Sequence, residues 1–132
     1  MRLFQGYNES TYKAIARKCD NAQLVKDVGY ARKLAYHNGG SCAIYAERVD
    51  DIAFILCQKQ RDALRIIGLG TAIEARGGGL ASYLLKRAEA YARREGLAKV
   101  HTRSQSGVQF YAKRGYDVIG MKEDDYLLEK TL

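Results

Sequence analysis

The stretch from residue 66 to residue 95 constrains the fold of this chain more than any other. An apolar segment, residues 66–73, runs into Arg-Gly-Gly-Gly-Leu-Ala at positions 76–81, and helical periodicity predicts an amphipathic helix from about Leu80 to Glu95. Glycines remove the Cβ atoms that would block close approach, and a helix N-terminus adds about half a positive charge. A strand, a glycine turn and a helix in this order can present backbone N–H groups to a phosphate.

Other phosphate-binding loops do not fit this stretch. A Walker loop needs a Gly-Lys-Ser/Thr ending, which is missing here, and no Gly-x-Gly-x-x-Gly occurs in the chain. The loop by itself leaves two interpretations open: a phosphate cradle, or a glycine-rich turn that merely joins two elements.

The charge of the chain favours an anionic partner. The sequence has 22 Lys and Arg against 15 Asp and Glu, a net charge of +7. Such an excess suits a nucleotide-containing cofactor, a nucleic acid or an acidic surface, and it does not choose among them. No run of five or more basic residues occurs, so a nucleic-acid-binding arm is not indicated.

Length and composition predict one domain, residues 1–132, in the cytoplasm. A chain of 132 residues has room for one real core. No run of about 18 apolar residues predicts a membrane span, and the N-terminus has no signal-peptide pattern. Cys19, Cys42 and Cys57 are widely spaced, which indicates neither a disulfide framework nor a zinc site; we expect all three to be buried as small apolar residues.

The pattern along the chain predicts an α/β fold (α+β in composition) with a mixed, mostly antiparallel sheet. We expect six to seven strands and about four helices in the order β-α-α-β-β-β-α-β-α-β-β. The first helix is capped by Asn8, Ser10 or Thr11, and the second ends at Asn38-Gly39-Gly40. The predicted strands cover residues 2–7, 41–49, 52–57, 64–73, 98–103, 117–121 and 126–132, with a polar turn at 58–63. Gly68 and Gly70 inside the fourth strand indicate a bulge, or close approach by another chain or a ligand.

Two segments in this order resemble the GCN5-related N-acetyltransferases, the GNAT family. Arg76, Gly79 and Ala81 match the pyrophosphate loop of the family, Gln/Arg-x-x-Gly-x-Gly/Ala. About thirty residues later, after a helix and a strand, residues 110–116 read Phe-Tyr-Ala-Lys-Arg-Gly-Tyr and resemble its Phe/Leu-Tyr-x-Lys-x-Gly-Phe/Tyr segment. The resemblance is specific from about Leu69 to Tyr116 and topological before that.

The resemblance implies a single GNAT-like domain that uses acetyl-CoA as acyl donor. In the family the cofactor sits where the fourth and fifth strands splay apart, and an amine attacks the thioester directly. The implied cofactor-binding residues are Leu69, Thr71, Arg76, Gly77, Gly78, Gly79, Leu80, Ala81, Ser82 and Ser104. Ser104 stands where the family often has Asn, which makes it a shorter contact to pantetheine. No metal is implied.

The resemblance also suggests catalytic residues. Tyr111 falls on the family's Tyr position, and its phenol could give a proton to the leaving thiolate; a core aromatic is the alternative. Residues 65–71 contain no carboxylate, so the base is less clear. His101 on the fifth strand could accept the amine proton if it faces the splay, or it could be a buried structural histidine. Glu47, Asp50, Asp51 and Glu74 could act through water, although each suits a turn or surface charge, and water alone could serve.

Three functions are consistent with these features. The first is an N-acetyltransferase that acts on an amine of unknown identity: a small molecule, a peptide or a protein. Acidic residues of the turns, among them Glu47, Asp50, Asp51, Glu123, Asp124 and Asp125, could attract a cationic amine. The second is an acyl-CoA-binding regulatory module with weak or no catalysis. A nucleic-acid binder is the third and the least favoured, since no nucleic-acid motif occurs. A homodimer is left open, and no membrane partner is expected.

Overall fold

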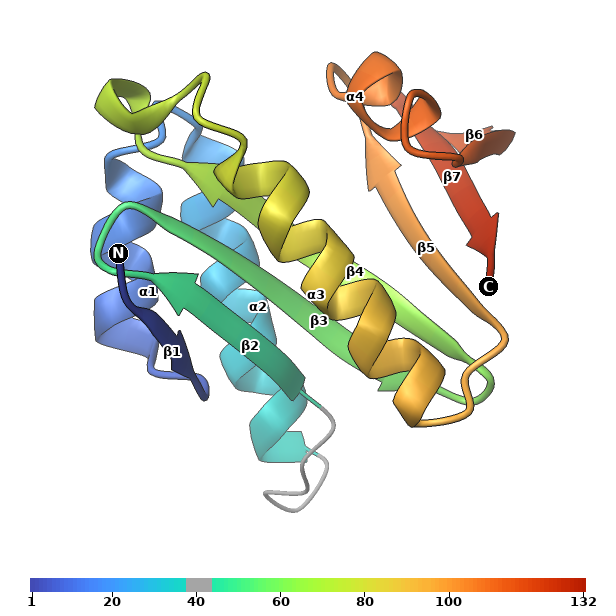
Figure 1. The fold of residues 1–132 in the computed structure, drawn as a ribbon, viewed down its shortest axis with the longest axis horizontal. Helices are drawn as coiled ribbons and strands as arrows, with labels where there is room; N and C mark the ends of the chain where they lie inside the picture. The colour runs from blue at the N-terminus through green and yellow to red at the C-terminus, as the bar shows by residue number, and fades with distance from the viewer. Residues whose placement is uncertain (38–43) are drawn as a thin grey trace.

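The computed structural model describes residues 1–37 and 44–132 of the chain (Figure 1). In chain order the elements are β1 (Leu3–Gln5), α1 (Glu9–Arg17), α2 (Ala22–His37), β2 (Ile44–Val49), β3 (Ala53–Gln60), β4 (Ala63–Thr71), the 3₁₀-helix η1 (Ile73–Ala75), α3 (Leu80–Arg94), β5 (Lys99–Ser104), α4 (Val108–Ala112), β6 (Asp117–Lys122) and β7 (Asp125–Thr131). The predicted order is confirmed, with η1 as an addition. The predicted helix end at Asn38-Gly39-Gly40, the strand start at Ser41 and the burial of Cys42 lie outside the described residues.

One sheet of seven strands runs through the molecule in the order β1-β2-β3-β4-β5-β7-β6. Every neighbouring pair is antiparallel except β4 and β5, which are parallel because α3 connects them as a crossover. Helices α1 and α2 cover one face of the sheet, and α3 crosses the opposite face (Figure 1). The predicted mixed and mostly antiparallel sheet is confirmed.

Helix α1 begins where a side chain caps it. Of the three candidate caps, Asn8 is the one used: its Oδ1 atom accepts a hydrogen bond from the Thr11 backbone N–H at 3.0 Å. Such a cap typically stabilises a helix by about 1 kcal/mol. Tyr12 and Ile15 of this helix are fully buried against Phe54 of β3 and the apolar face of α2, which fixes the helical pair on the sheet.

The second part of the core lies between the sheet and α3. Leu84, Leu85 and Ala88 of α3 are buried against Ile55 of β3 and Val100 of β5. Because α3 packs on strands from both halves of the sheet, it fixes the loop at its own N-terminus relative to β4 and β5. The two predicted buried thiols that the structure describes, Cys19 and Cys57, are buried and free.

The two glycines of β4 have a clear structural cause. The ladder with β3 shifts register between Leu56 and Cys57, which leaves Ile67 unpaired as the predicted bulge. A Cβ atom on Gly70 would lie 2.6 Å from a methyl carbon of Leu24 in α2. The close approach on this face of β4 is therefore made by the protein's own helix, where the sequence had suggested another chain or a ligand.

One predicted turn is wrong in extent. Residues 58–63 were expected to form a polar turn, but β3 continues to Gln60 and a shorter turn at Arg61-Asp62 leads into β4. Gln58 pairs with Arg65 in the ladder and is buried. Ladder pairing and burial thus override the polar character of these side chains.

Within the described residues, no helix is long and apolar enough to cross a membrane.

Candidate functional site

The glycine loop presents a row of backbone N–H groups that other described residues leave unpaired. Gly77 and Gly79 have φ values of 87° and 79°, a left-handed conformation that favours glycine. Gly79 is the N-cap of α3 and offers no side-chain cap, and Tyr83 donates the first backbone bond of the helix to its carbonyl at 2.9 Å. The amides of residues 77–82 make no backbone or side-chain hydrogen bond to the described part of the chain, so they are available to a ligand.

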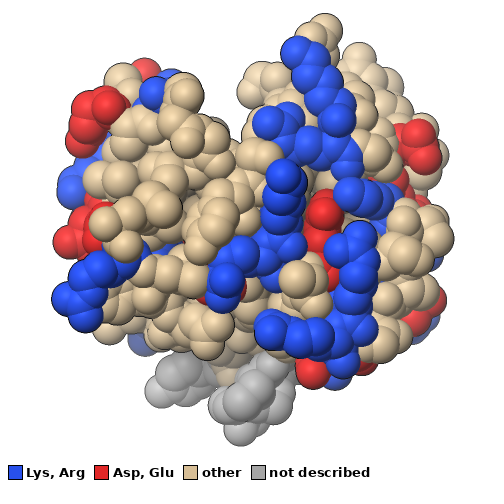
Figure 2. All heavy atoms as spheres, viewed as in Figure 1, with Lys and Arg blue, Asp and Glu red and all other residues tan. Residues whose placement is uncertain are grey.

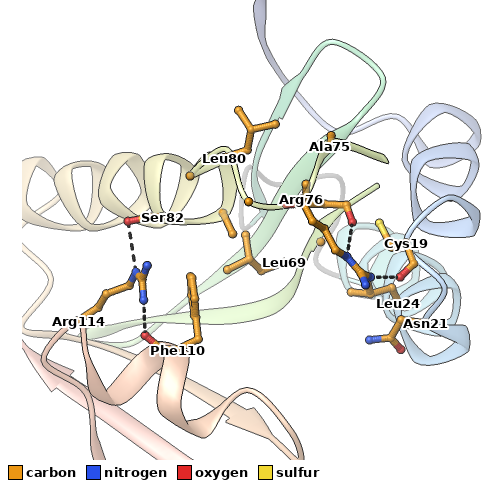
Figure 3. Close-up of a pocket in the computed structure, with 15 residues that line it drawn as sticks. Cys19, Asn21, Leu24, Leu69, Ala75, Arg76, Leu80, Ser82, Phe110 and Arg114 are labelled. Atoms are coloured by element: carbon orange, nitrogen blue, oxygen red, sulfur yellow. Dashed lines mark hydrogen bonds between the residues drawn. The ribbon is translucent and has the colours of Figure 1, made fainter. Parts of the chain in front are cut away.

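A pocket of about 540 Å³ lies beside this loop (Figure 3). A Cβ atom added to Gly77 or Gly79 would have no neighbour within 4 Å, so the space next to both glycines is open. The pocket is lined by Cys19, Asn21, Leu24, Leu69, Gly70, Thr71, Ala75, Arg76, Gly77, Gly79, Leu80, Ala81, Ser82, Phe110 and Arg114. The sequence stretch that constrains the fold therefore forms one wall of a cavity.

Arg76 stabilises the loop from the side of α1. Its guanidinium donates hydrogen bonds to the backbone carbonyl of Cys19 and, from Nε at 3.4 Å, to that of Thr71 (Figure 3). The sequence left open whether this side chain binds phosphate or is a solvated loop charge. In this structure it connects the glycine loop to the turn after α1.

The opposite wall is made by α4 and the residues just after it. Arg114 donates from Nε to the Ser82 hydroxyl at 3.2 Å and from Nη1 to the Phe110 carbonyl at 2.7 Å, and its guanidinium lies 3.9 Å from the centre of the Phe110 ring (Figure 3). Arg114 therefore places a positive charge at the N-terminus of α3. The sequence analysis missed Arg114 because it occupies a variable position of the resembled segment.

The strands β4 and β5 separate next to this pocket. Their parallel ladder covers three residue pairs, from Ala63 with Lys99 to Arg65 with His101. Beyond Arg65, β4 pairs with β3 and makes no described pair with β5, and its last three residues, Leu69, Gly70 and Thr71, line the pocket. One edge of β4 is thus open at the point where the glycine loop begins.

The structure brings most of the predicted binding residues together. Leu69, Thr71, Arg76, Gly77, Gly79, Leu80, Ala81 and Ser82 all line the pocket, whereas Gly78 and Ser104 do not. The Ser104 hydroxyl instead accepts a hydrogen bond from the Gly107 backbone N–H at 2.8 Å. A Cβ atom on Gly107 would lie 2.8 Å from the same hydroxyl oxygen, so the close contact with Ser104 requires glycine at position 107.

Tyr111 lies in the core directly behind the pocket wall. It is 7% exposed, and its ring packs edge-on against Phe110, which does line the pocket. Burial raises the pKa of Tyr111 well above its usual range, and hydrogen bonding with the Thr102 side chain partly opposes that rise. The phenol therefore stays protonated at neutral pH and can act as a hydrogen-bond donor.

His101 lies away from the glycine loop. It lines a second hollow, of about 870 Å³, together with Arg65, Arg103 and residues of β6 and β7. Burial lowers the pKa of His101, and the nearby Arg65 guanidinium lowers it further. Its neighbours Val100 and Thr102 point to the opposite, α3-covered face of β5 and are buried there. The structure does not bring His101 together with the cofactor-binding residues, and its role stays a prediction.

Three of the other candidate carboxylates are engaged elsewhere. Glu47 is buried and forms an ion pair with Arg87 of α3 at 2.9 Å, so it is neither a turn residue nor a surface charge. Asp50 accepts a hydrogen bond from the Arg2 backbone N–H, and Asp51 pairs with Arg48 at 2.8 Å. A carboxylate that the sequence analysis did not consider, Asp27 of α2, lies close to β4 at Gly68.

Comparison with known proteins identifies this arrangement. A sequence model of the acetyltransferase (GNAT) family matches residues 5–116. The chain belongs to the GNAT family. This confirms the resemblance seen in the sequence. Comparison with curated proteins finds no match.

Solved structures of GNAT enzymes share the fold over its whole length. The PaiA N-acetyltransferase from Thermoplasma acidophilum, solved in complex with coenzyme A, has a TM-score of 0.75 and 16% sequence identity, with 100% of both chains covered. The aminoglycoside 6'-N-acetyltransferase from Enterococcus faecium has a TM-score of 0.75 and 15% identity, over 99% of this chain and 97% of that one. An IAA acetyltransferase from Bacillus cereus has a TM-score of 0.70 and 15% sequence identity, with 99% of both chains covered. At such identities the likeness concerns the GNAT fold.

Proposed function

We propose that residues 1–132 form one catalytic domain that transfers an acetyl group from acetyl-CoA to a primary amine by direct attack in a ternary complex. The observation that carries this proposal is the pocket between the glycine loop and the open edge of β4, together with the amides of residues 77–82, which have no hydrogen-bond partner among the described residues. Membership of the GNAT family and the coenzyme A bound to the T. acidophilum structure support acetyl-CoA as donor.

The residues of the pocket suit the parts of that cofactor. The amides of residues 77–82, at the positive end of α3, would hold the pyrophosphate, and Arg114 would add a cation beside it. Lys and Arg gather on the face that carries α3, where Lys86, Arg93 and Arg94 are exposed, which favours the approach of a polyanion (Figure 2). The apolar side chains of Leu69 and Leu80 would contact the pantetheine arm.

The proposed reaction needs no covalent intermediate on the enzyme. The amine nitrogen attacks the thioester carbonyl carbon, a C–N bond forms, the C–S bond breaks, and the thiolate takes up a proton. Acetyl-CoA and the ammonium form of the amine thus give the amide, free coenzyme A and one proton. The protein contributes position and hydrogen-bond donors, chiefly through the loop and the backbone of residues 69–71.

Tyr111→Phe should lower kcat by about 10- to 100-fold, the range expected for one hydrogen bond to a developing charge. The phenol of Tyr111 is protonated and lies one ring behind the pocket wall, so we propose that it donates to the leaving thiolate. Acetyl-CoA affinity should stay within about twofold, because the thiolate forms only during the reaction. Stopped-flow rates and calorimetry check both values, with the exposed Tyr83→Phe as control. An unchanged kcat would mean that Tyr111 only packs.

A second candidate function is an acyl-CoA-binding regulatory module. It is favoured by the pocket lining, which contains no carboxylate and no histidine among the described residues. A screen of primary amines with acetyl-CoA, monitored by thiol release and by the mass of the acetylated amine, separates the two functions. Equal amounts of free thiol and acetylated amine would support the enzyme. Cofactor binding without transfer to any amine would support the module.

The amine acceptor, the oligomeric state and the cellular location of the protein stay predictions. The sequence predicts a cytoplasmic location and leaves a homodimer open, and light scattering of the purified protein measures the oligomeric state. Nucleic acid is not expected as a partner, since the sequence contains no nucleic-acid-binding motif. A binder of nucleic acid would lose affinity steeply with salt, which a salt titration measures.

A further inference from the structure

Asp27 lies on α2 directly over the irregular part of β4. Its Cβ atom is 3.5 Å from the position of a Cβ built on Gly68, the residue that follows the bulge at Ile67. Because Gly68 has no side chain, the Cβ atom of Asp27 can lie close to the β4 backbone. At this point β4 no longer pairs with β5.

Asp27 is also one helical turn away from the wall of the cofactor pocket. Leu24, three residues earlier on α2, lines that pocket and contacts Gly70 of β4. One turn of α-helix advances about 5.4 Å, so Leu24 covers Gly70 and Asp27 covers the part of β4 near Gly68. In the proposed function the acetyl group lies against residues 69–71. Asp27 is therefore placed beside the reacting carbon, on the side of the sheet that α1 and α2 cover.

The negative charge of Asp27 is not neutralised by an ion pair. Among the described residues its one hydrogen-bond donor is the Gln23 side-chain amide, at 3.1 Å. The two cations nearest to Asp27 already have partners. Arg65 of β4 donates a hydrogen bond to the Tyr30 hydroxyl at 3.2 Å and lies over the Tyr30 ring. Arg103 of β5 forms an ion pair with Asp125 of β7 at 2.8 Å.

We infer that the Asp27 carboxylate forms the acceptor half of the active site, where it binds the ammonium group of a cationic primary amine and takes a proton from it. This inference rests on the proposed function and names its substrate class: alkylamines that are protonated at neutral pH. It also supplies a base, which the cofactor pocket itself lacks.

The proton balance of the step is simple. The ammonium gives one proton to the carboxylate, which passes it to solvent, and the neutral amine then attacks the thioester carbonyl carbon. The attacking nitrogen loses its next proton as the C–S bond breaks, and that proton ends on the coenzyme A sulfur. No oxidant, metal or further reactant is needed.

The surroundings of Asp27 set the direction of its pH response. Burial raises the pKa of Asp27, the nearby Asp125 carboxylate raises it further, and the Gln23 hydrogen bond, Arg65 and Arg103 oppose the rise. The base must be ionised to accept a proton. The rate kcat/KM should therefore fall as the pH drops through a value above the usual aspartate range.

Asp27→Asn should lower kcat/KM at least about 100-fold for butylamine, which is protonated at neutral pH. For O-butylhydroxylamine, which has a similar shape and is neutral at that pH, the loss should be below about tenfold, since no proton must be removed before attack. The variant should also lose the acidic limb of the pH profile. Its acetyl-CoA affinity, measured by calorimetry, should stay within about twofold of the wild type.

Controls separate failure of this inference from failure of the proposed function. Asp117→Asn removes the same charge at an exposed position of β6 and should leave kcat/KM unchanged for both amines. Equal losses of kcat/KM for both amines with an unchanged pH profile would show a structural role for Asp27 and overturn this inference alone. An Asp27→Asn variant with wild-type rates would also overturn this inference alone. A wild-type protein that binds acetyl-CoA but acetylates no primary amine of the screen described above would overturn the proposed function, and this inference with it.

Discussion

Gly79→Glu is expected to weaken acetyl-CoA binding at least about 100-fold, a loss of about 2.7 kcal/mol. Gly79 has a φ of 79°, and a Cβ atom there would enter open space beside the pocket. A glutamate at this position would put bulk and a negative charge where the pyrophosphate is proposed to bind. Calorimetric titration of the variant with acetyl-CoA measures the effect.

The matched control is Gly79→Gln. It has the same shape and the same left-handed backbone, which costs a side chain about 1–2 kcal/mol, but it carries no charge. Both variants should therefore lose similar thermal stability, and the glutamate should weaken cofactor binding more than the glutamine. If both bound acetyl-CoA as tightly as the wild type, the loop would be only a connection between β4 and α3.

Lys130→Met is expected to destabilise the protein by about 2–3 kcal/mol, because it leaves a buried carboxylate without its cation. Glu89 of α3 is 5% exposed and accepts hydrogen bonds from Lys130 Nζ at 3.1 Å and from the Tyr116 hydroxyl at 2.8 Å. Lys130 also donates to the Arg114 carbonyl at 2.9 Å. The group thereby holds β7 and the residues just after α4 against α3. The α4 segment and the N-terminal part of α3 line opposite sides of the pocket.

A double-mutant cycle separates this ion pair from simple packing. Replacing Lys130 by Met together with Glu89 by Leu removes both charges, and a buried pair replaced by apolar residues is often neutral for stability. We therefore expect the double variant to recover most of the unfolding free energy lost in Lys130→Met, as measured by urea denaturation. A double variant as unstable as the sum of the two single variants would contradict the importance of the charge pair.

The sequence predicted the parts of the site that are local in the chain. The loop from Arg76 to Ala81 and the helix after it are specified by glycines and by helical periodicity within a few residues. Their mutual placement follows from the same short segment, because the loop is also the N-cap of α3. The element order could be predicted for the same reason, since strand and helix periods are local properties.

Asp27 and His101 show what the sequence could not predict. Asp27 comes next to Gly68 because α2 packs across β4, and the 40 positions between them carry no signal of that contact. Alternation along β5 places His101 on one face of the strand, but which face meets the cofactor depends on α3 covering the side of Val100 and Thr102. Arg114 stands at a variable position of the resembled segment, and its partner Ser82 lies 32 residues earlier, on α3, so no local signal marked it.

Thermal unfolding with and without acetyl-CoA measures whether the glycine loop and β4 form a cofactor site. The purified wild-type protein is heated alone and with acetyl-CoA, coenzyme A, ATP or duplex DNA. A ligand at about 100 times its dissociation constant stabilises the folded state by about 2.7 kcal/mol, which raises the midpoint of a domain this size by several degrees. We expect such a shift with acetyl-CoA and coenzyme A and none with duplex DNA. No shift with either coenzyme at millimolar concentration would contradict the proposal that the glycine loop and β4 form an acetyl-CoA site.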